Sequence, residues 1–200
     1  MLGLGLLLKN RCGRGLLGMI ALLASFQPMN HSAASDQQLR PRIYLANPLG
    51  FSEAGRAFIH DVILPALGKY GHVINPFDLV DAKKIAELKG MPAGEDRIRA
   101  WRIFNAEIGK LNQDHIDNSD IVFAVLDGTD VDSGTSSEIG YAYARQKLII
   151  GYRGDFRLSA DNEGGIVNLQ VEHFIRASGG TIIHELSELD QALSSTLPRQ

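Results

Sequence analysis

From residue 42 onward, short apolar runs alternate with segments in which apolar residues recur at helical spacing. This alternation is typical of a parallel sheet whose strands are joined by crossover helices. The run from Ile121 to Leu126 is continuously apolar, as expected of a strand that is buried on both faces. With right-handed crossovers, the pattern predicts an α/β fold, a three-layer α/β/α sandwich of the flavodoxin or Rossmann kind. Five strands are expected, at residues 43–46, 72–75, 121–126, 148–152 and 181–184.

Helices are predicted between these strands. Ser52 should cap the first helix, whose apolar residues recur at helical spacing as far as Leu67, and Pro65 should end or kink it. The other helices are expected at residues 81–89, 95–116, 137–146 and 167–177.

The loop after the third strand carries the chemistry that the sequence reveals best. Ligands of open parallel sheets bind at the carboxyl ends of the strands, and Asp127-Gly128 ends this strand. Asp132 follows in the loop, and Ser136 or Ser137 can cap the next helix, which places Glu138 in its first turn. There the helix dipole should keep Glu138 ionised, so that it can attack an electron-poor carbon with Asp132 as its partner.

The acidic residues of this loop admit other interpretations. Asp127, Asp130 and Asp132 could simply be turn residues, and for Asp130 this interpretation is favoured. The spacing excludes a calcium loop and a Walker phosphate loop. An aspartyl-phosphate mechanism is excluded because Val125 stands where the nucleophile would be needed. What remains is a pair of carboxylates suited to the cleavage of a glycosidic bond through an oxocarbenium-like state.

Aromatic and amide side chains follow the first strand and would complete such a pocket. Tyr44 lies on the strand, and Asn47 and Phe51 lie on the loop that follows it. Tyr44 could also be a half-buried strand residue whose hydroxyl needs a partner, but its position favours a functional role.

Composition narrows the class of ligand. The 200 residues carry a formal net charge of -3 and no basic run, so nucleic acid is not expected as a partner. A small ligand with little charge is expected instead. The single cysteine, Cys12, excludes a disulfide framework, and the six histidines show no paired spacing for a metal. No metal site is therefore predicted.

The first 40 residues differ from the rest and are not expected to belong to the fold. Basic residues precede an apolar run at 15–26, and residues 32–34 resemble the cleavage site of a secretory signal peptide, which predicts a periplasmic or secreted protein. Alternatively, translation starts at Met29, ahead of a polar lead, which predicts a cytoplasmic protein. Both interpretations stay open, and the folded domain is expected at residues 41–196.

Three segments together carry a resemblance to a known family. They are IYLANPLGF from residue 43, D-x-G-x-x-x-E-x-G from Asp132 to Gly140, and IVNLQ around Asn168. With them, residues 42–193 resemble the nucleoside 2-deoxyribosyltransferases and the related nucleotide N-glycosidases. The resemblance implies a five-stranded parallel sheet between helices, in agreement with the apolar pattern.

The resemblance also implies roles for individual residues. Glu138 would take 2-deoxyribose from a nucleoside as a covalent glycosyl enzyme, and a free nucleobase would then capture the sugar. Asp132 would hold and protonate the departing base, and Tyr44 would orient Glu138. Asn168 would reach the hydroxyl of the sugar that is bound in a neighbouring subunit, which implies a homodimer or a multiple of a dimer with shared active sites. No metal or organic cofactor is implied.

Two further positions bear on the base. Where the family often has an aspartate, this chain has Asn112, which weakens a proton-transfer role at that place. Asp127 and Gly128 would add a contact to the base.

Three functions remain after this comparison. Transfer between nucleobases is the first hypothesis, and water in place of the acceptor base would give hydrolysis, either as a side activity or as the action of a nucleotide N-glycosidase. The first loop offers Ser52 and Arg56 near a 5'-phosphate but is otherwise not cationic, which favours an uncharged nucleoside. A non-catalytic nucleotide-binding module is the third hypothesis.

Overall fold

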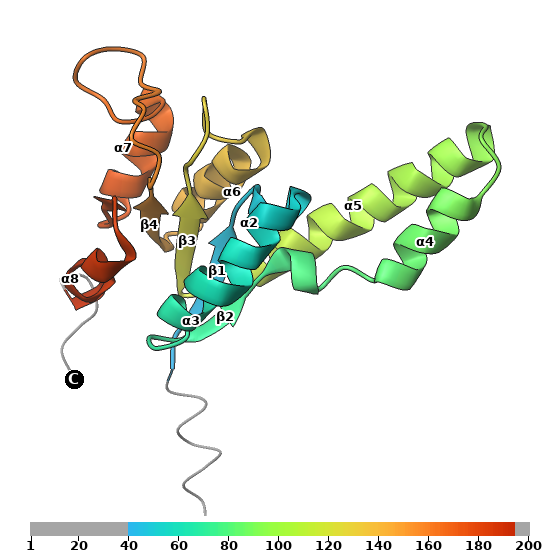
Figure 1. Cartoon of the computed structure of the whole chain (residues 1–200), viewed down its shortest axis with the longest axis horizontal. Coiled ribbons are helices and arrows are strands. Elements are labelled where there is room, and N and C mark those ends of the chain that lie inside the picture. The colour runs from blue at the N-terminus through green and yellow to red at the C-terminus, as the bar shows by residue number, and fades with distance from the viewer. Residues whose placement is uncertain (1–39, 195–200) are drawn as a thin grey trace, which may run out of the picture.

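A computed structural model describes residues 40–194, which form a five-stranded parallel sheet between helices (Figure 1). The strand order is β2-β1-β3-β4-β5, the order of flavodoxin-like folds, so the predicted fold is confirmed. All five strands overlap the predicted segments. Their bounds are Arg42–Ala46 for β1, His72–Ile74 for β2, Ile121–Val125 for β3, Leu148–Tyr152 for β4 and Ile182–Ile183 for β5.

Side chains alternate between the two faces of the sheet and form two apolar layers. On β1, Tyr44 packs into one layer and Leu45 into the other. The layer that holds Tyr44 is covered by α6, α7 and the end of α5, and the opposite layer by α2, α3 and α8. The bounds are Glu53–Phe58 for α2, Leu64–Leu67 for α3, Glu95–Asp117 for α5, Ser133–Ala144 for α6, Leu169–Ala177 for α7 and Leu189–Ser194 for α8.

The first helix does not end at Pro65. Helical structure continues from α2 through a π-helical turn, Ile59–Ile63, into α3. The wider turn leaves Pro65 in the first turn of α3, where a missing amide proton costs least. Short 3-10 turns lie at Leu49–Phe51, Pro76–Asp78 and Leu186–Glu188.

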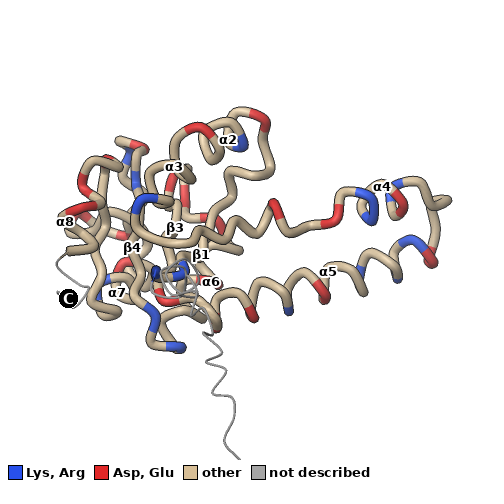
Figure 2. The backbone as a smooth tube through the Cα atoms, turned by 90° about the horizontal axis from the view of Figure 1, so that it is seen from below, with Lys and Arg blue, Asp and Glu red and all other residues tan. Residues whose placement is uncertain are grey.

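The helix α4, Ala82–Gly90, and the long helix α5 form an arm that projects from the body (Figures 1 and 2). Acidic and basic residues are spread along both helices of the arm (Figure 2). Trp101 and Phe104 stack edge to face on α5, and Leu88 of α4 is buried. The arm reaches the body where α5 ends, at the buried Ile116.

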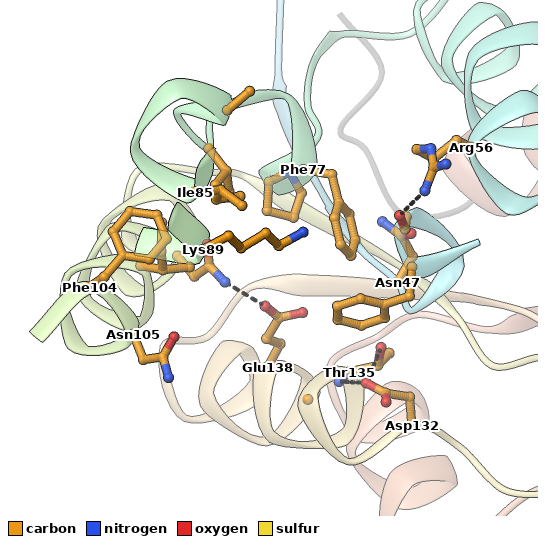
Figure 3. A pocket seen from close by; sticks show the side chains of 18 residues that line it. Asn47, Arg56, Phe77, Ile85, Lys89, Phe104, Asn105, Asp132, Thr135 and Glu138 are labelled. Carbon is orange, nitrogen blue, oxygen red and sulfur yellow. Dashed lines mark hydrogen bonds between the residues drawn. The ribbon is translucent and has the colours of Figure 1, made fainter. Parts of the chain in front are cut away.

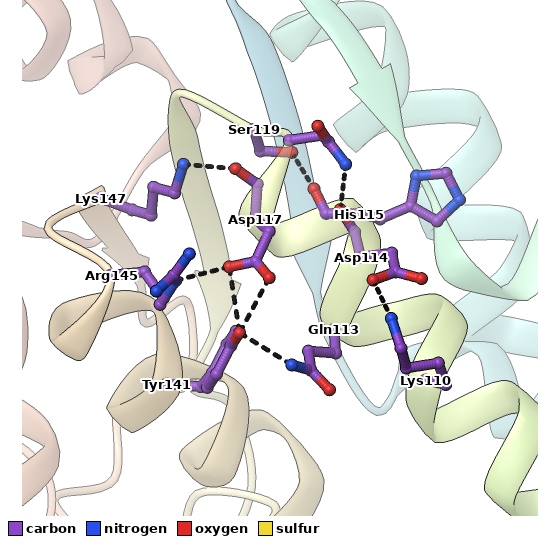
Figure 4. A network of polar contacts seen from close by, with 10 residues as sticks. Lys110, Gln113, Asp114, His115, Asp117, Ser119, Tyr141, Arg145 and Lys147 are labelled. Atoms are coloured by element: carbon purple, nitrogen blue, oxygen red, sulfur yellow. Dashed lines mark hydrogen bonds and ion pairs between the residues drawn. The ribbon is translucent and has the colours of Figure 1, made fainter.

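Polar contacts fix this end of α5 to α6 (Figure 4). The carboxylate of Asp117 accepts hydrogen bonds from the Tyr141 hydroxyl at 2.9 and 3.0 Å and from Arg145 Nε at 2.6 Å. Lys147 Nζ donates to the Asp117 carbonyl at 2.7 Å. Desolvation opposes ionisation of Asp117, but the hydrogen bonds from Tyr141 and Arg145 outweigh it and lower the pKa of this carboxyl. The network therefore holds the base of the arm against α6.

The start of α6 differs from the prediction. Asp132, not Ser136 or Ser137, is the N-cap, and its carboxylate accepts from Thr135 N at 2.9 Å. All three residue types are favoured at this position, so the sequence alone did not separate them. The last predicted helix also starts later, at Leu169, because Asn168 caps it.

Two expectations concern residues at the ends of the chain. The signal-like or mis-started segment lies outside the described residues except for Arg40, and so do the last two residues of the predicted domain, 195 and 196. Within residues 40–194, no helix is both long and apolar enough to cross a membrane.

Candidate active site

A cavity of about 690 Å³ opens at the carboxyl edge of the sheet (Figure 3). It lies next to β1 and β3, where the strand order reverses direction, which is the usual ligand position in such folds. The loop after β1, the segment after β2, the arm and the first turns of α6 form its walls. Its lining includes the side chains of Asn47, Phe51, Arg56, Phe77, Ile85, Lys89, Phe104, Asn105, Asn112, Asp132 and Glu138.

Glu138 lies in the second turn of α6 and is held by one oxygen only. The Tyr44 hydroxyl donates to Glu138 Oε1 at 2.6 Å, and Asn112 Nδ2 donates to the same atom at 3.4 Å. Glu138 Oε2 receives no hydrogen bond from the residues that the structure describes. The carboxylate is thus oriented by two donors while its second oxygen stays available to a ligand.

Burial sets the charge of this carboxyl. Desolvation raises the pKa of Glu138 to about 7, the hydrogen bond from Tyr44 works in the opposite direction, and the charge of Asp132 raises it further. The expectation that the helix dipole keeps Glu138 ionised is wrong, because α6 begins at Ser133 and Glu138 lies beyond its first turn. Near neutral pH the ionised and protonated forms of Glu138 are similarly populated.

Tyr44 is a permanent donor in this pair. Its side chain is fully buried in the sheet layer that packs against α6. Burial, and after it the negative charge of Glu138, raise the pKa of the Tyr44 phenol far above its usual value. The phenol therefore keeps its proton and donates a hydrogen bond to Glu138 Oε1.

Asp132 is the N-cap of α6 and also lies in the cavity wall. Its Oδ2 accepts from the backbone N of Thr135 at 2.9 Å and from its Oγ1 at 3.3 Å. Asp132 Oδ1 accepts no hydrogen bond from the described residues. One carboxylate oxygen thus belongs to the helix cap, and the other is free to meet a ligand.

The loop after β1 is shaped by Asn47 and closed by two aromatic rings. The buried Asn47 accepts from Leu49 N at 3.0 Å and donates to Leu45 O at 3.1 Å. Phe51 is 79% exposed at the cavity rim and meets Phe77 edge to face, with ring centroids 5.0 Å apart. A Cβ at Gly50 would lie 2.2 Å from the Phe77 ring, so glycine is what lets this ring reach the cavity.

Several lining residues were not predicted. Phe77 follows β2, and Ile85, Lys89, Phe104 and Asn105 come from the arm. The local sequence around the arm residues gives little indication that they line a cavity. They come together only when α4 and α5 pair and turn one face to the sheet edge. The position of Phe77 could have been inferred from the sheet, because a parallel sheet brings the segment after β2 to the same edge as the loop after β1.

Three residues predicted to bind substrate do not line the cavity of this chain. Asp127 Oδ1 accepts from Asp155 N at 2.8 Å, and the Gly128 carbonyl accepts from the buried Arg153 at 3.0 Å. Both residues therefore organise the loop after β4. Asn168 caps α7 by accepting from Gln170 N at 3.0 Å.

Comparison with known proteins decides the family. Residues 43–171 match the family model of nucleoside 2-deoxyribosyltransferase. The chain belongs to the nucleoside 2-deoxyribosyltransferase family. This match spans the sheet edge and every cavity residue discussed above, from Asn47 to Glu138, which confirms the resemblance drawn from the sequence. A search among curated proteins returned no match.

Two solved structures share the fold of this deoxyribosyltransferase family member at low identity, and a third is similar with a lower TM-score. A conserved protein from Enterococcus faecalis V583 is 21% identical, with a TM-score of 0.58 over 79% of this chain and 99% of that one. A 2-desoxiribosyltransferase from Leishmania mexicana is 23% identical, with a TM-score of 0.50 over 77% and 95% of the two chains. A CMP N-glycosidase from Clostridium botulinum is 24% identical, with a TM-score of 0.44 over 78% and 99%.

Across residues 40–194, no three histidine, cysteine, aspartate or glutamate side chains come together in a way that could hold a metal ion.

The raised pKa of Glu138 predicts a pH-dependent stability. In the unfolded chain the carboxyl ionises above its ordinary pKa of 4.5, whereas in the folded protein it ionises only near pH 7. The stability from the buried, protonated form is present below pH 4.5 and is lost as the pH rises toward 7. At about 1.4 kcal/mol per pKa unit, the loss approaches about 3 kcal/mol. Glu138→Gln, which does not ionise, should therefore be more stable than the wild type at pH 8 and similar to it at pH 4.5.

Denaturant unfolding at several pH values measures this difference. Glu107→Gln is the matched control, because Glu107 is exposed on α5 and makes no hydrogen bond or ion pair with the described residues. A gap between the wild type and Glu138→Gln that stays constant over this pH range would contradict the raised pKa.

Proposed function

We propose that the protein transfers 2-deoxyribose between nucleobases through a covalent intermediate on Glu138. The observation that carries the proposal is the one-sided restraint of this carboxylate. Tyr44 and Asn112 hold Oε1, while Oε2 is free at the wall of a cavity large enough for a nucleoside. Membership of the deoxyribosyltransferase family supports the same chemistry.

The reaction follows from that geometry in two displacements. Oε2 of ionised Glu138 attacks the anomeric carbon, the bond from this carbon to the base nitrogen breaks, and its electron pair leaves with the base. A ring nitrogen of a second nucleobase then attacks the same carbon and releases the Glu138 carboxylate. The sugar passes through an oxocarbenium-like state in each step. No metal or organic cofactor takes part in this scheme.

The cavity walls suit a flat base beside a polar sugar. Phe77, Ile85 and Phe104 offer apolar and aromatic surface, and Asp132 and Asn105 offer polar groups that can fix the orientation of the base. Bases bury their faces and keep their edges hydrogen-bonded, so such a mixture favours a nucleobase over an aliphatic ligand.

Asn168 extends the proposal to a second subunit. It does not line the cavity of its own chain, and its neighbour in the sequence, Leu169, is an apolar side chain that is 58% exposed. The resemblance to the family implies that an asparagine at this place reaches the sugar of a neighbouring subunit. We infer a homodimer, or a multiple of one, in which Asn168 reaches the sugar in the partner's cavity.

A second candidate function is hydrolysis of a nucleoside 5'-monophosphate. Arg56 lies at the cavity wall, and its guanidinium uses one nitrogen to donate to Gly50 O at 3.1 Å. Its remaining donors are free to bind a phosphate. In this case water would replace the acceptor base.

Incubation of the full chain with thymidine, with and without adenine, separates the two candidates. Formation of deoxyadenosine indicates transfer. In a parallel incubation with thymidine monophosphate, release of thymine and 2-deoxyribose 5-phosphate, without cleavage of thymidine, indicates the nucleotide hydrolase. Glu138→Gln should lower the rate by roughly a thousandfold or more, because the nucleophile is lost. Glu107→Gln, which removes an exposed carboxylate, should match the wild type. Full activity in Glu138→Gln would exclude the assigned nucleophile.

Tyr44→Phe should change the pH dependence of the reaction. The hydrogen bond from Tyr44 opposes the rise in the pKa of Glu138, so its loss should raise that pKa further above about 7. Activity needs the ionised carboxylate, and the acid limb of kcat/KM should therefore move to higher pH. Rates at pH 6 should fall more than rates at pH 8.5. An unchanged acid limb would show that Tyr44 does not control the ionisation of Glu138.

A further inference from the structure

Arg153 is a buried cation that lies outside the cavity. It directly follows β4 at the carboxyl edge of the sheet, is 1% exposed and does not belong to the cavity lining. Within residues 40–194, no carboxylate forms an ion pair with its guanidinium. A buried charge needs compensating contacts, and here backbone carbonyls supply them. The guanidinium therefore acts on the protein and not on a ligand.

This guanidinium joins two loops at the sheet edge. Its Nη1 donates to the carbonyl of Leu126, directly after β3. Its Nη2 donates to the Gly128 carbonyl at 3.0 Å and to the Arg157 carbonyl, on the loop after β4, at 2.6 Å. The backbone N of Arg153 donates in turn to Ile183 O on β5 at 2.8 Å. Because the guanidinium is planar and rigid, it holds these carbonyls in a fixed relation to one another.

A second contact ties the same two loops together. Asp127 Oδ1 accepts from Asp155 N at 2.8 Å. Gly128 has a φ of +128°, a backbone conformation that glycine adopts most readily, and a Cβ there would lie 3.0 Å from Asp130 O. The first three residues after β3 are thus fixed to the loop after β4.

The held loop leads directly to Asp132 at the cavity wall (Figure 3). Between Gly128 and Asp132, only Thr129 and Asp130 are exposed, and Val131 is buried in the apolar layer under α6. A segment spans at most about 3.3–3.6 Å per residue, so a short one that is anchored at both ends has little freedom to move. The contacts of Arg153 therefore limit where the carboxylate of Asp132 can lie.

We propose that Arg153 is a positioning residue for Asp132. The proposal rests on the proposed transfer at Glu138, in which the family resemblance assigns the departing base to Asp132. When the bond from the anomeric carbon to the base nitrogen breaks, the base takes the electron pair, and the help that it receives depends on the place of this carboxylate. A misplacement of about 1 Å can lower a rate by roughly a hundredfold. Arg153 sets that place through two backbone carbonyls, without contact to the substrate.

Leaving-group dependence tests this role in Arg153→Lys, which keeps the charge but not the planar fork. The donors are 2'-deoxyuridine and 5-fluoro-2'-deoxyuridine, because fluorine withdraws electrons and lets the base depart with less help. Arg153→Lys should lower kcat for deoxyuridine by roughly tenfold or more, and for the fluorinated donor by less than about threefold. Arg102→Lys is the matched control, since Arg102 is exposed on α5 and outside the cavity lining, and it should match the wild type.

A double-mutant cycle separates positioning from a general loss of stability. Asp132→Asn removes the carboxylate but keeps a side chain that can cap α6. If Arg153 acts through Asp132, adding Arg153→Lys to Asp132→Asn should lower kcat for deoxyuridine by less than about a further twofold. Losses that multiply in the double variant, an equal loss for both donors, or an unchanged kcat in Arg153→Lys would each overturn the proposal.

Asp127→Ala applies the same test without changing a buried charge, and it decides if Arg153→Lys does not fold. It removes the bond from Asp155 N at a half-buried position. Its kcat should also fall more for deoxyuridine than for the fluorinated donor. Equal losses for the two donors, or no loss, would show that this loop does not control the departure of the base.

Binding of free uracil separates a failure of this proposal from a failure of the proposed function. Calorimetry compares the wild type, Arg153→Lys, Asp132→Asn and the double variant. If each single variant weakens binding and the double variant adds no further loss, while no donor is cleaved, Arg153 positions Asp132 and the proposed transfer fails. If bases are exchanged but the losses multiply, the transfer stands and the role of Arg153 is rejected.

Discussion

The hydrogen bond from Tyr44 to Glu138 is the contact on which the site depends. It joins the inner strand β1 to α6 at 2.6 Å, between residues that lie far apart in the sequence. A buried phenol can satisfy its hydroxyl only with a partner inside the protein, so the position of Glu138 is fixed as tightly as the core itself. Since this bond uses one carboxylate oxygen, the second oxygen is left for chemistry.

The same burial that fixes the carboxylate also makes its charge costly. Burial orients Glu138 but raises its pKa to about 7, because the ionised carboxylate is desolvated. The hydrogen bond from Tyr44 stabilises the ionised form and so limits this rise. The arm contributes to this balance, because Asn112 on α5 adds a second donor to the same oxygen. The Asp117 network holds that end of α5 against α6, so a contact distant from the cavity supports the geometry of Glu138.

The sequence was sufficient to predict the sheet and the main residues of the site. Continuous apolar runs mark strands buried on both faces, and the carboxyl ends of such strands meet at one edge, which is why Tyr44, Asn47 and Glu138 could be placed together. The start of α6 could not be predicted, because Asp132, Ser136 and Ser137 are all good caps and only the folded chain selects one. The wrong helix start placed Glu138 in the first turn, where the helix dipole was expected to set its charge. Burial sets its charge instead, and burial depends on the packing of the whole protein.

Long-range contacts account for the other differences. Asp127 and Gly128 follow β3 like site residues, yet they hold the loop after β4 through Asp155 and Arg153, and no local pattern announces those partners. Lys89 and Phe77 reach the cavity from separate segments that only the pairing of α4 with α5 and the parallel sheet bring near Glu138.

Trapping the glycosyl enzyme tests the central claim most directly. The protein is incubated with a nucleoside whose sugar carries fluorine at C2, which slows release of the sugar, and the labelled peptide is identified by mass spectrometry. The account predicts one sugar bound to Glu138, with none on the Glu138→Gln variant. An adduct on another residue, or no adduct while bases are still exchanged, would contradict it.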